Sequence, residues 1–150
     1  MRKLLLSLLA ALVLSGGVAF AQQQGMWAGL SGGFPGASVH FGVENVVQNL
    51  DVRANLGYTY VLGTASFGVD ALYGLDLDLD GAPVDVYVGG GVGAAFDGTF
   101  SVKALGGAEY RLVDVGVPEL GVFFEVGPVL SFGNSDGFGA DARLGVNYHF

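Results

Sequence analysis

The chain contains no cysteine, and beyond its first residues it has very few basic side chains. Without cysteine, neither a disulfide nor a lipid-modified N-terminal cysteine is possible. After residue 21, four bases stand against all 14 acids and leave a net charge of −10; they are Arg53, Lys103, Arg111 and Arg143. No basic stripe is present to neutralise phosphates, so nucleic acid is not an expected partner.

Long apolar runs are also missing beyond the N-terminus. A helix needs about 20 consecutive apolar residues to cross a bilayer, so their absence argues against a helical membrane protein. The mean hydropathy is nevertheless high, at +0.54, and the chain has 27 glycines and 12% aromatic residues. These apolar residues must therefore be spread by alternation along strands.

The N-terminus has the three parts of a secretory signal peptide. Met1-Arg2-Lys3 is basic, residues 4–14 are apolar, and Ala19-Phe20-Ala21 is a small-x-small cleavage site. We expect residues 1–21 to be removed and residues 22–150 to form one exported domain. An uncleaved anchor is the alternative, although its apolar segment is short for a bilayer span.

The last thirteen residues alternate without a fault between two kinds of side chain. One face takes Phe138, Ala140, Ala142, Leu144, Val146, Tyr148 and Phe150. The other takes Gly139, Asp141, Arg143, Gly145, Asn147 and His149. Because successive residues of a strand point to opposite faces, this segment predicts a strand with one apolar face and one face of polar residues and glycine.

The same alternation recurs along the chain between turn signals. The predicted strands are 25–33, 36–44, 50–62, 65–80, 84–96, 100–112, 119–131 and 138–150. Short segments rich in Gly, Pro, Asn and Asp separate them. The sequence therefore predicts an all-β fold, an eight-stranded antiparallel up-and-down barrel with short turns.

Two features indicate that the apolar face lies outside. The polar face is rich in glycine and has too few charges to solvate a closed cylinder, and an eight-stranded lumen has no room for the Tyr and Phe of the apolar face. Facing outward, those residues form a lipid-contacting band, and the barrel must close because lipid tolerates no open sheet edge. A soluble periplasmic ligand-binding barrel would have the faces reversed.

The signal peptide, the meander and the C-terminal pattern Gly145-x-x-Tyr148-x-Phe150 together resemble small bacterial outer-membrane barrels. The chain is similar to the OmpA transmembrane domain and to OmpX- and OmpW-like proteins. The resemblance implies location in the outer membrane of a diderm bacterium, contact with its lipid, and recognition of the C-terminal strand by the barrel-assembly machinery. It implies no single activity, and the outer loops of this chain are short for an adhesin or receptor.

With both termini on the periplasmic side, the aromatic residues divide into two girdles. The outer girdle comprises Phe34, Tyr58, Tyr60, Phe67, Phe96, Phe100, Phe132 and Phe138. The periplasmic girdle comprises Trp27, Tyr110, Tyr148 and Phe150.

The lumen holds the candidate functional residues. They are expected to form an ion-pair network of Arg53, Asp76, Asp85, Lys103, Arg111, Glu125, Asp141 and Arg143. Tight turns predict Asp85 opposite Arg111, Arg53 diagonal to Asp76, and Glu125 diagonal to Arg143. Buried charge is costly without a partner, so we expect each lumen base to lie beside an acid.

Signals for catalysis, metals and cofactors are weak. Residues 76–81 match the opening of a calcium loop, but position twelve of that loop is Tyr87 and not Glu. Ser38 and His40 share a strand face but have no evident third partner. We expect a non-enzymatic protein with no cofactor and no metal. The sequence predicts a structural role with an ion-paired, plugged lumen; the alternative is a narrow pore or a conduit for a small hydrophobic ligand.

Overall fold

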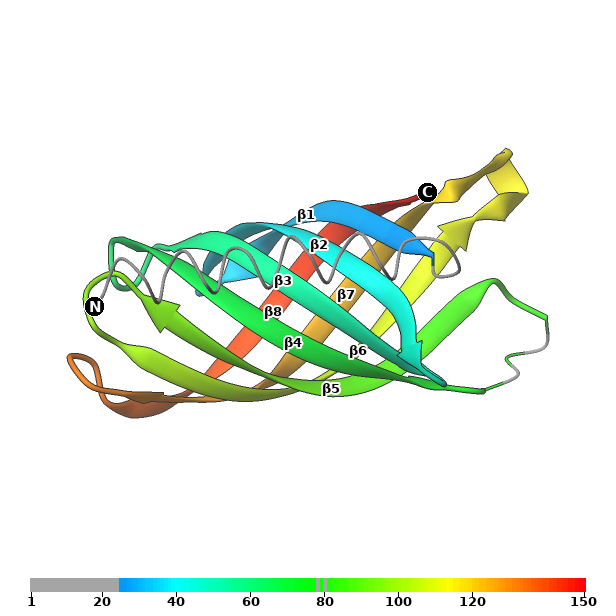
Figure 1. Cartoon of the computed structure of the whole chain (residues 1–150). Coiled ribbons are helices and arrows are strands. Elements are labelled where there is room, and N and C mark those ends of the chain that lie inside the picture. Colours follow the sequence, from blue (N-terminus) through cyan, green and yellow to red (C-terminus); the bar gives the residue numbers. More distant parts are fainter. Residues whose placement is uncertain (1–24, 78, 80) are drawn as a thin grey trace, which may run out of the picture.

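A computed structural model describes residues 25–150 of this chain except 78 and 80, and these residues form one closed β-barrel (Figure 1). The predicted signal peptide, residues 1–21, lies outside the described residues. The strands are β1 (Met26–Phe34), β2 (Gly36–Val47), β3 (Leu50–Thr59), β4 (Thr64–Leu75), β5 (Val84–Ala95), β6 (Phe100–Leu112), β7 (Val117–Phe132) and β8 (Gly137–His149). A 3₁₀ turn, η1 (Val113–Val115), joins β6 to β7.

Each strand pairs antiparallel with the next, and β1 pairs with β8 to close the barrel. Beyond the last paired strand residues, Phe150 and Met26 exchange two backbone hydrogen bonds of 2.9 and 3.3 Å. Closure leaves no strand edge unpaired, as predicted from the sequence. No helix in the described part of the chain is long and apolar enough to cross a bilayer.

The two ends of the barrel differ in their connections. At one end, called here the terminal mouth, lie Met26, Phe150, and the connections 48–49, 76–83 and 113–116. The opposite end, the far mouth, holds Pro35 and the turns 60–63, 96–99 and 133–136. In Figure 1 the terminal mouth is on the right, where the β6–β7 hairpin extends past the rest of the sheet.

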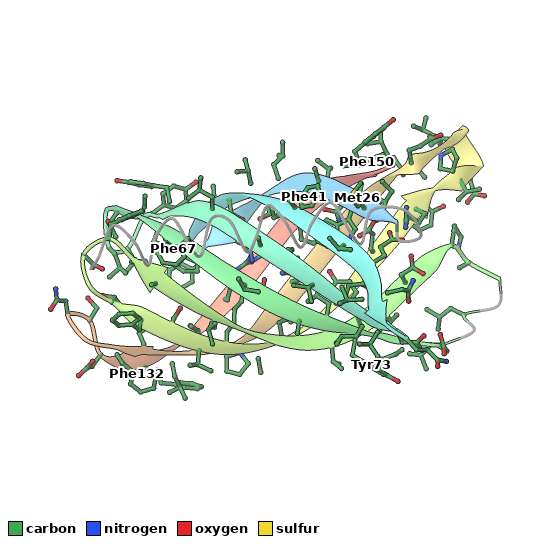
Figure 2. The ribbon with its side chains drawn as sticks, viewed as in Figure 1. Met26, Phe41, Phe67, Tyr73, Phe132 and Phe150 are labelled. Atoms are coloured by element: carbon green, nitrogen blue, oxygen red, sulfur yellow. The ribbon has the colours of Figure 1, made fainter. Side chains whose placement is uncertain are left out.

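Alternation sets the two faces of the sheet as the sequence predicts. Exposed Leu, Val, Phe and Tyr side chains cover the outside of the barrel (Figure 2). All eight aromatic residues predicted for the outer girdle are exposed, and Phe67 and Phe132 lie near the far mouth in Figure 2. Tyr110, Tyr148 and Phe150 are exposed toward the terminal mouth.

The prediction was wrong for Trp27, which points into the lumen and is only 4% exposed. Its indole lies against Gly42, its partner on β2, and a Cβ at that position would clash with the ring. The glycine therefore opens room for an inward Trp. Its place near the end of a strand suggested a girdle residue, but the face on which a residue lies depends on alternation, not on its height along the barrel.

Strand limits differ from the prediction mainly at β3 and β4. Strand β3 ends at Thr59 and β4 at Leu75, so the turn 60–63 has four residues and the connection 76–83 has eight. Gly63 closes the turn with a φ of +64°, a left-handed conformation that favours glycine. The predicted two-residue turn at 63–64 placed Arg53 near Asp76, whereas the observed register places Arg53 opposite Asp70.

Candidate functional site: the lumen

In the middle of the lumen, one arginine lies between two acids. Arg53 on β3 donates to Asp70 on β4 at 2.8 and 3.0 Å and to Glu125 on β7 at 2.6 and 2.9 Å. The Tyr87 hydroxyl donates a further 2.9 Å hydrogen bond to Glu125. Arg53 and Asp70 are 1% exposed and Glu125 is 2% exposed. We call Arg53, Asp70, Glu125 and Tyr87 the central plug.

Apolar rings fill the space around the central plug. Phe123 is 1% exposed, and its ring meets the edge of His40 with centroids 5.5 Å apart. The Arg53 guanidinium lies 5.9 Å from the centre of the Trp27 ring, within cation–π range. Leu72 and Leu105 complete the buried apolar residues of the described chain. At the height of the plug, the lumen is thus filled by side chains.

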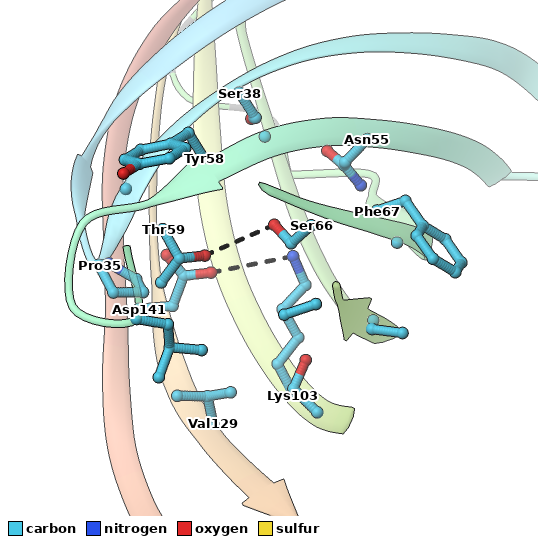
Figure 3. A pocket seen from close by; sticks show the side chains of 18 of the residues that line it. Pro35, Ser38, Asn55, Tyr58, Thr59, Ser66, Phe67, Lys103, Val129 and Asp141 are labelled. Atoms are coloured by element: carbon cyan, nitrogen blue, oxygen red, sulfur yellow. Dashed lines mark hydrogen bonds and ion pairs between the residues drawn. The ribbon is translucent and has the colours of Figure 1, made fainter. Parts of the chain in front are cut away.

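A second group of charges continues from the plug toward the far mouth. Lys103 lies 2.9 Å from Asp70 and 3.8 Å from Asp141. Arg143 bonds Asp141 and approaches Glu125 at 3.8 Å. Between these residues and the far mouth lies a cavity of about 170 Å³. It is lined in part by hydroxyl side chains, including the Thr59–Ser66 pair (Figure 3). Lys103 and Asp141 form its floor.

A third group lines the terminal mouth. His40 bonds Asn147 at 2.7 Å, Asn147 donates to Glu109 at 2.5 Å, and His149 contacts both Glu109 and Glu44 at 2.6 and 2.7 Å. Arg111 lies 3.4 to 3.5 Å from Glu44, Asp85 and Glu109. All of these residues except His40 line a cavity of about 320 Å³.

Glycine makes room for these lumen side chains. A Cβ at Gly91 would clash with Asp70, and one at Gly121 would clash with Glu109. At Gly107 the nearest atoms would be Tyr87 and Glu125, 2.8 to 2.9 Å away. The glycines of the polar face thus lie beside its large charged side chains, and the lumen fills without overlap.

The structure brings six of the eight predicted lumen residues into the interior. Lys103, Asp141 and Arg143 lie in the far-mouth group, Arg53 and Glu125 in the plug, and Arg111 in the terminal-mouth group. Asp85 contacts Arg111 but is 69% exposed at the mouth, and its partner in register is Glu109. Glu125 lies directly opposite Arg143, not diagonal to it.

The predicted pairing of Arg53 with Asp76 was wrong. Asp76 is exposed at the terminal mouth and accepts a 2.9 Å hydrogen bond from Asn49. The prediction missed Asp70, Glu44, Glu109, Asn147 and the two histidines as network members. Asp70 and Glu109 stand on the inward faces of their predicted strands, so alternation indicated them, and a correct position for the β3–β4 turn would have paired Asp70 with Arg53.

The C-terminal residues of the predicted assembly signal occupy two faces of β8. Gly145 is buried, and a Cβ there would lie 2.5 Å from the Phe123 ring. Tyr148 and Phe150 are exposed on the outside, with ring centroids 6.2 Å apart. Gly145 therefore leaves space for the Phe123 ring inside the lumen, and the Tyr148 and Phe150 side chains are accessible for contact outside the barrel.

Comparison with known proteins gives matches only in structure. No protein-family profile matches the chain, and no curated protein matches it in sequence. A de novo designed transmembrane β-barrel superposes with a TM-score of 0.59 at 18% identity, covering 85% of this chain and 95% of the design. A major outer membrane protein from Thermus thermophilus gives 0.55 at 17% identity, covering 86% and 100%.

Neisserial surface protein A is a further match, with a TM-score of 0.48 and 14% identity over 85% of this chain and 94% of that one. Fold class and the resemblance to small outer-membrane barrels are confirmed by the closed strand order and the first two matches. The chain has the closed, eight-stranded, antiparallel fold of transmembrane β-barrels.

Proposed function

We propose that this chain is an integral outer-membrane β-barrel that has a structural role in the cell envelope and a lumen closed by ion pairs. Export by a cleaved signal peptide and insertion by the barrel-assembly machinery, acting on the strand that ends at Phe150, belong to the same proposal. The role is passive: the barrel needs no cofactor and catalyses no reaction.

The observation that carries the proposal is the central plug. Arg53 bridges Asp70 and Glu125, which belong to strands on different sides of the lumen. Each of these three side chains is at most 2% exposed, which supports a lumen without an open path for water or ions. Barrels of eight strands are generally filled by side chains, and here the filling is polar, paired and continuous with Phe123.

The alternative function is a narrow pore or a conduit for a small hydrophobic ligand. Two cavities, of about 170 and 320 Å³, approach the plug from opposite mouths. A path would need the central plug and the rings packed around it, such as Phe123, to rearrange. A soluble ligand-binding barrel is disfavoured because the exposed outer face carries Leu30, Val92, Phe124 and Leu144.

Two measurements test the proposal. The protein in membranes of expressing cells should migrate faster unheated than heated on a denaturing gel, and it should fractionate with the outer membrane. Absence of that shift, or solubility without detergent, would contradict the barrel in the membrane.

Conductance across planar bilayers separates the plug from the pore. The extracted barrel should show no steady openings, whereas an Arg53→Ser, Phe123→Ala variant should conduct and prefer cations, because acids outnumber bases in the lumen. Steady openings of the unmodified barrel that change in Glu125→Gln or Arg143→Ala would favour the pore.

A further inference from the structure

The basic residues of this barrel are all inside it. Among residues 25–150, leaving aside 78 and 80, the Lys and Arg side chains are Arg53, Lys103, Arg111 and Arg143, and each is at most 24% exposed and paired with lumen acids. His40 and His149 also point inward, toward Asn147 and Glu109. Over this part of the chain, the outer face presents no cation, and at the rims Arg111 is the one partly exposed base, 24% exposed and beside Asp85.

The exposed charges at the rims are acids. At the terminal mouth, Asp76, Asp85, Asp114 and Glu119 are exposed. At the far mouth, Asp136 is exposed and Asp97 is half-buried, and both accept backbone hydrogen bonds within their turns. The basic side chains are paired with acids inside the lumen, so the exposed residues at the rims carry a net negative charge.

Rim charge decides which lipid headgroups a barrel can contact. An anionic leaflet carries a negative surface potential, and a basic residue near it gains about 1 kcal/mol, so an acid at the same depth is repelled. This barrel has rim acids at both mouths, and within the described residues the base beside one of them is Arg111, which pairs with Asp85 and leaves the other rim acids without a basic partner. Its negative rims are not repelled by a headgroup layer without net charge and are repelled by a layer with net negative charge.

We propose that the barrel selects membrane leaflets whose headgroups carry no net negative charge. This inference rests on the proposed membrane location and names the lipid class that the barrel accepts. The aromatic girdles supply the apolar contact at both rims, and headgroup recognition needs no ion pair to a lipid phosphate.

The test uses protein extracted from membranes of expressing cells and refolded into two kinds of vesicle with the same acyl chains. One is phosphatidylcholine alone, and in the other part of it is replaced by phosphatidylglycerol. Urea titration read by the gel shift gives the folding equilibrium constant in each. It should be lower in the anionic vesicles at low salt, and the difference should disappear at high salt because salt screens exposed charges.

Two matched pairs of variants place a charge at one rim at a time. Val61 in the far-mouth turn is 63% exposed, and Val115 in η1 is 68% exposed. Relative to the Gln variant at the same position, Val61→Lys or Val115→Lys should raise the folding constant about fivefold in anionic vesicles, by the energy of one base near such a surface. Neither should change it in phosphatidylcholine.

The possible outcomes distinguish this inference from the proposed function. Equal or greater stability of the unmodified barrel in anionic vesicles at low salt overturns the headgroup selection alone. The headgroup selection is also overturned if the Lys variants have no higher folding constant than the matched Gln variants in anionic vesicles. A chain that folds in neither vesicle overturns the membrane location, and the headgroup inference with it.

Discussion

At the scale of single residues, the lumen is stabilised by side chains that each have several partners. Arg53 neutralises two acids, and Glu125 accepts from both Arg53 and Tyr87. A buried ion pair is costly to form, yet removing one partner leaves an uncompensated charge, which costs more. The central plug therefore stabilises the barrel only as a complete unit.

Arg53→Met should lower the free energy of unfolding by about 3 to 5 kcal/mol, the usual cost of stranding a buried charge. Asp70 and Glu125 would be left facing each other with no arginine between them. Urea titration in phosphatidylcholine vesicles measures the change. Adding Asp70→Asn and Glu125→Gln to the same variant should restore most of the stability, and a triple variant no better than the single one contradicts the plug.

Two adjacent glycines on β6 provide a matched test of lumen packing. Gly107→Ala would place a methyl group 2.8 to 2.9 Å from Tyr87 and Glu125, whereas Gly106→Ala would have no heavy atom within 4 Å. Overpacking costs about 1 to 3 kcal/mol, so the Gly107 variant should lose that much. The Gly106 variant should be neutral or slightly more stable because its unfolded chain is less flexible. Equal effects at both sites would mean that the glycines do not shape the lumen.

At the scale of strands and turns, the position of a turn in the sequence decides which side chains meet. The four-residue turn 60–63 pairs Thr59 with Thr64 and so sets Arg53 opposite Asp70. Moving the centre of the turn by one residue along the chain would shift the pairing by two positions and give Arg53 another partner. Turn residues such as Gly63 were visible in the sequence, but the length of the turn was not, since strand alternation continues through 60–62.

The role of Phe150 in the predicted assembly signal can be separated from a role in folding. Phe150→Ala should leave refolding in vesicles nearly unchanged, because the Phe150 side chain is 58% exposed and its backbone still pairs with Met26. If the assembly machinery reads this residue, the amount of heat-shifted barrel in cell membranes should fall several-fold.

Phe138→Ala is the control, since Phe138 is an exposed aromatic at the other end of the same strand. Equal assembly of the Phe150 variant, the Phe138 variant and the unmodified chain would remove Phe150 from the signal. A Phe150 variant that also fails to refold in vesicles would assign it a packing role.

At the scale of the whole molecule, closure of the sheet separates two environments. The outside is apolar along the strands, and the inside holds the plug and two polar mouths. Hydrocarbon outside the barrel makes a charge there costly, whereas water would tolerate it. This difference distinguishes a membrane barrel from a soluble one with the same strands.

Leu144→Arg tests the environment of the outer face. Leu144 is 59% exposed near the middle of β8, so in lipid the variant should lose about 2 to 4 kcal/mol of folding free energy. Val115→Arg, beyond the strand ends, should lose about 0 to 1 kcal/mol. Urea titration in vesicles compares the two. Similar small losses at both positions would indicate that water surrounds the outer face.

Sequence alone determined the eight strands, the two faces of the strands from residue 50 onward and the outward direction of the apolar face. These follow from a side-chain period of two and from the amount of charge available, which are local properties. It also placed Lys103, Glu125, Asp141 and Arg143 inside the barrel.

Only the tertiary structure decided the partners. Arg53 and Glu125 are 72 residues apart in the chain and meet because the closed barrel brings β3 and β7 across one narrow lumen. The choice of Asp70 over Asp76 depends on register, which the position of the turn fixes and alternation does not. Alternation repeats every two residues, so every even shift of a strand keeps its faces and changes all its neighbours.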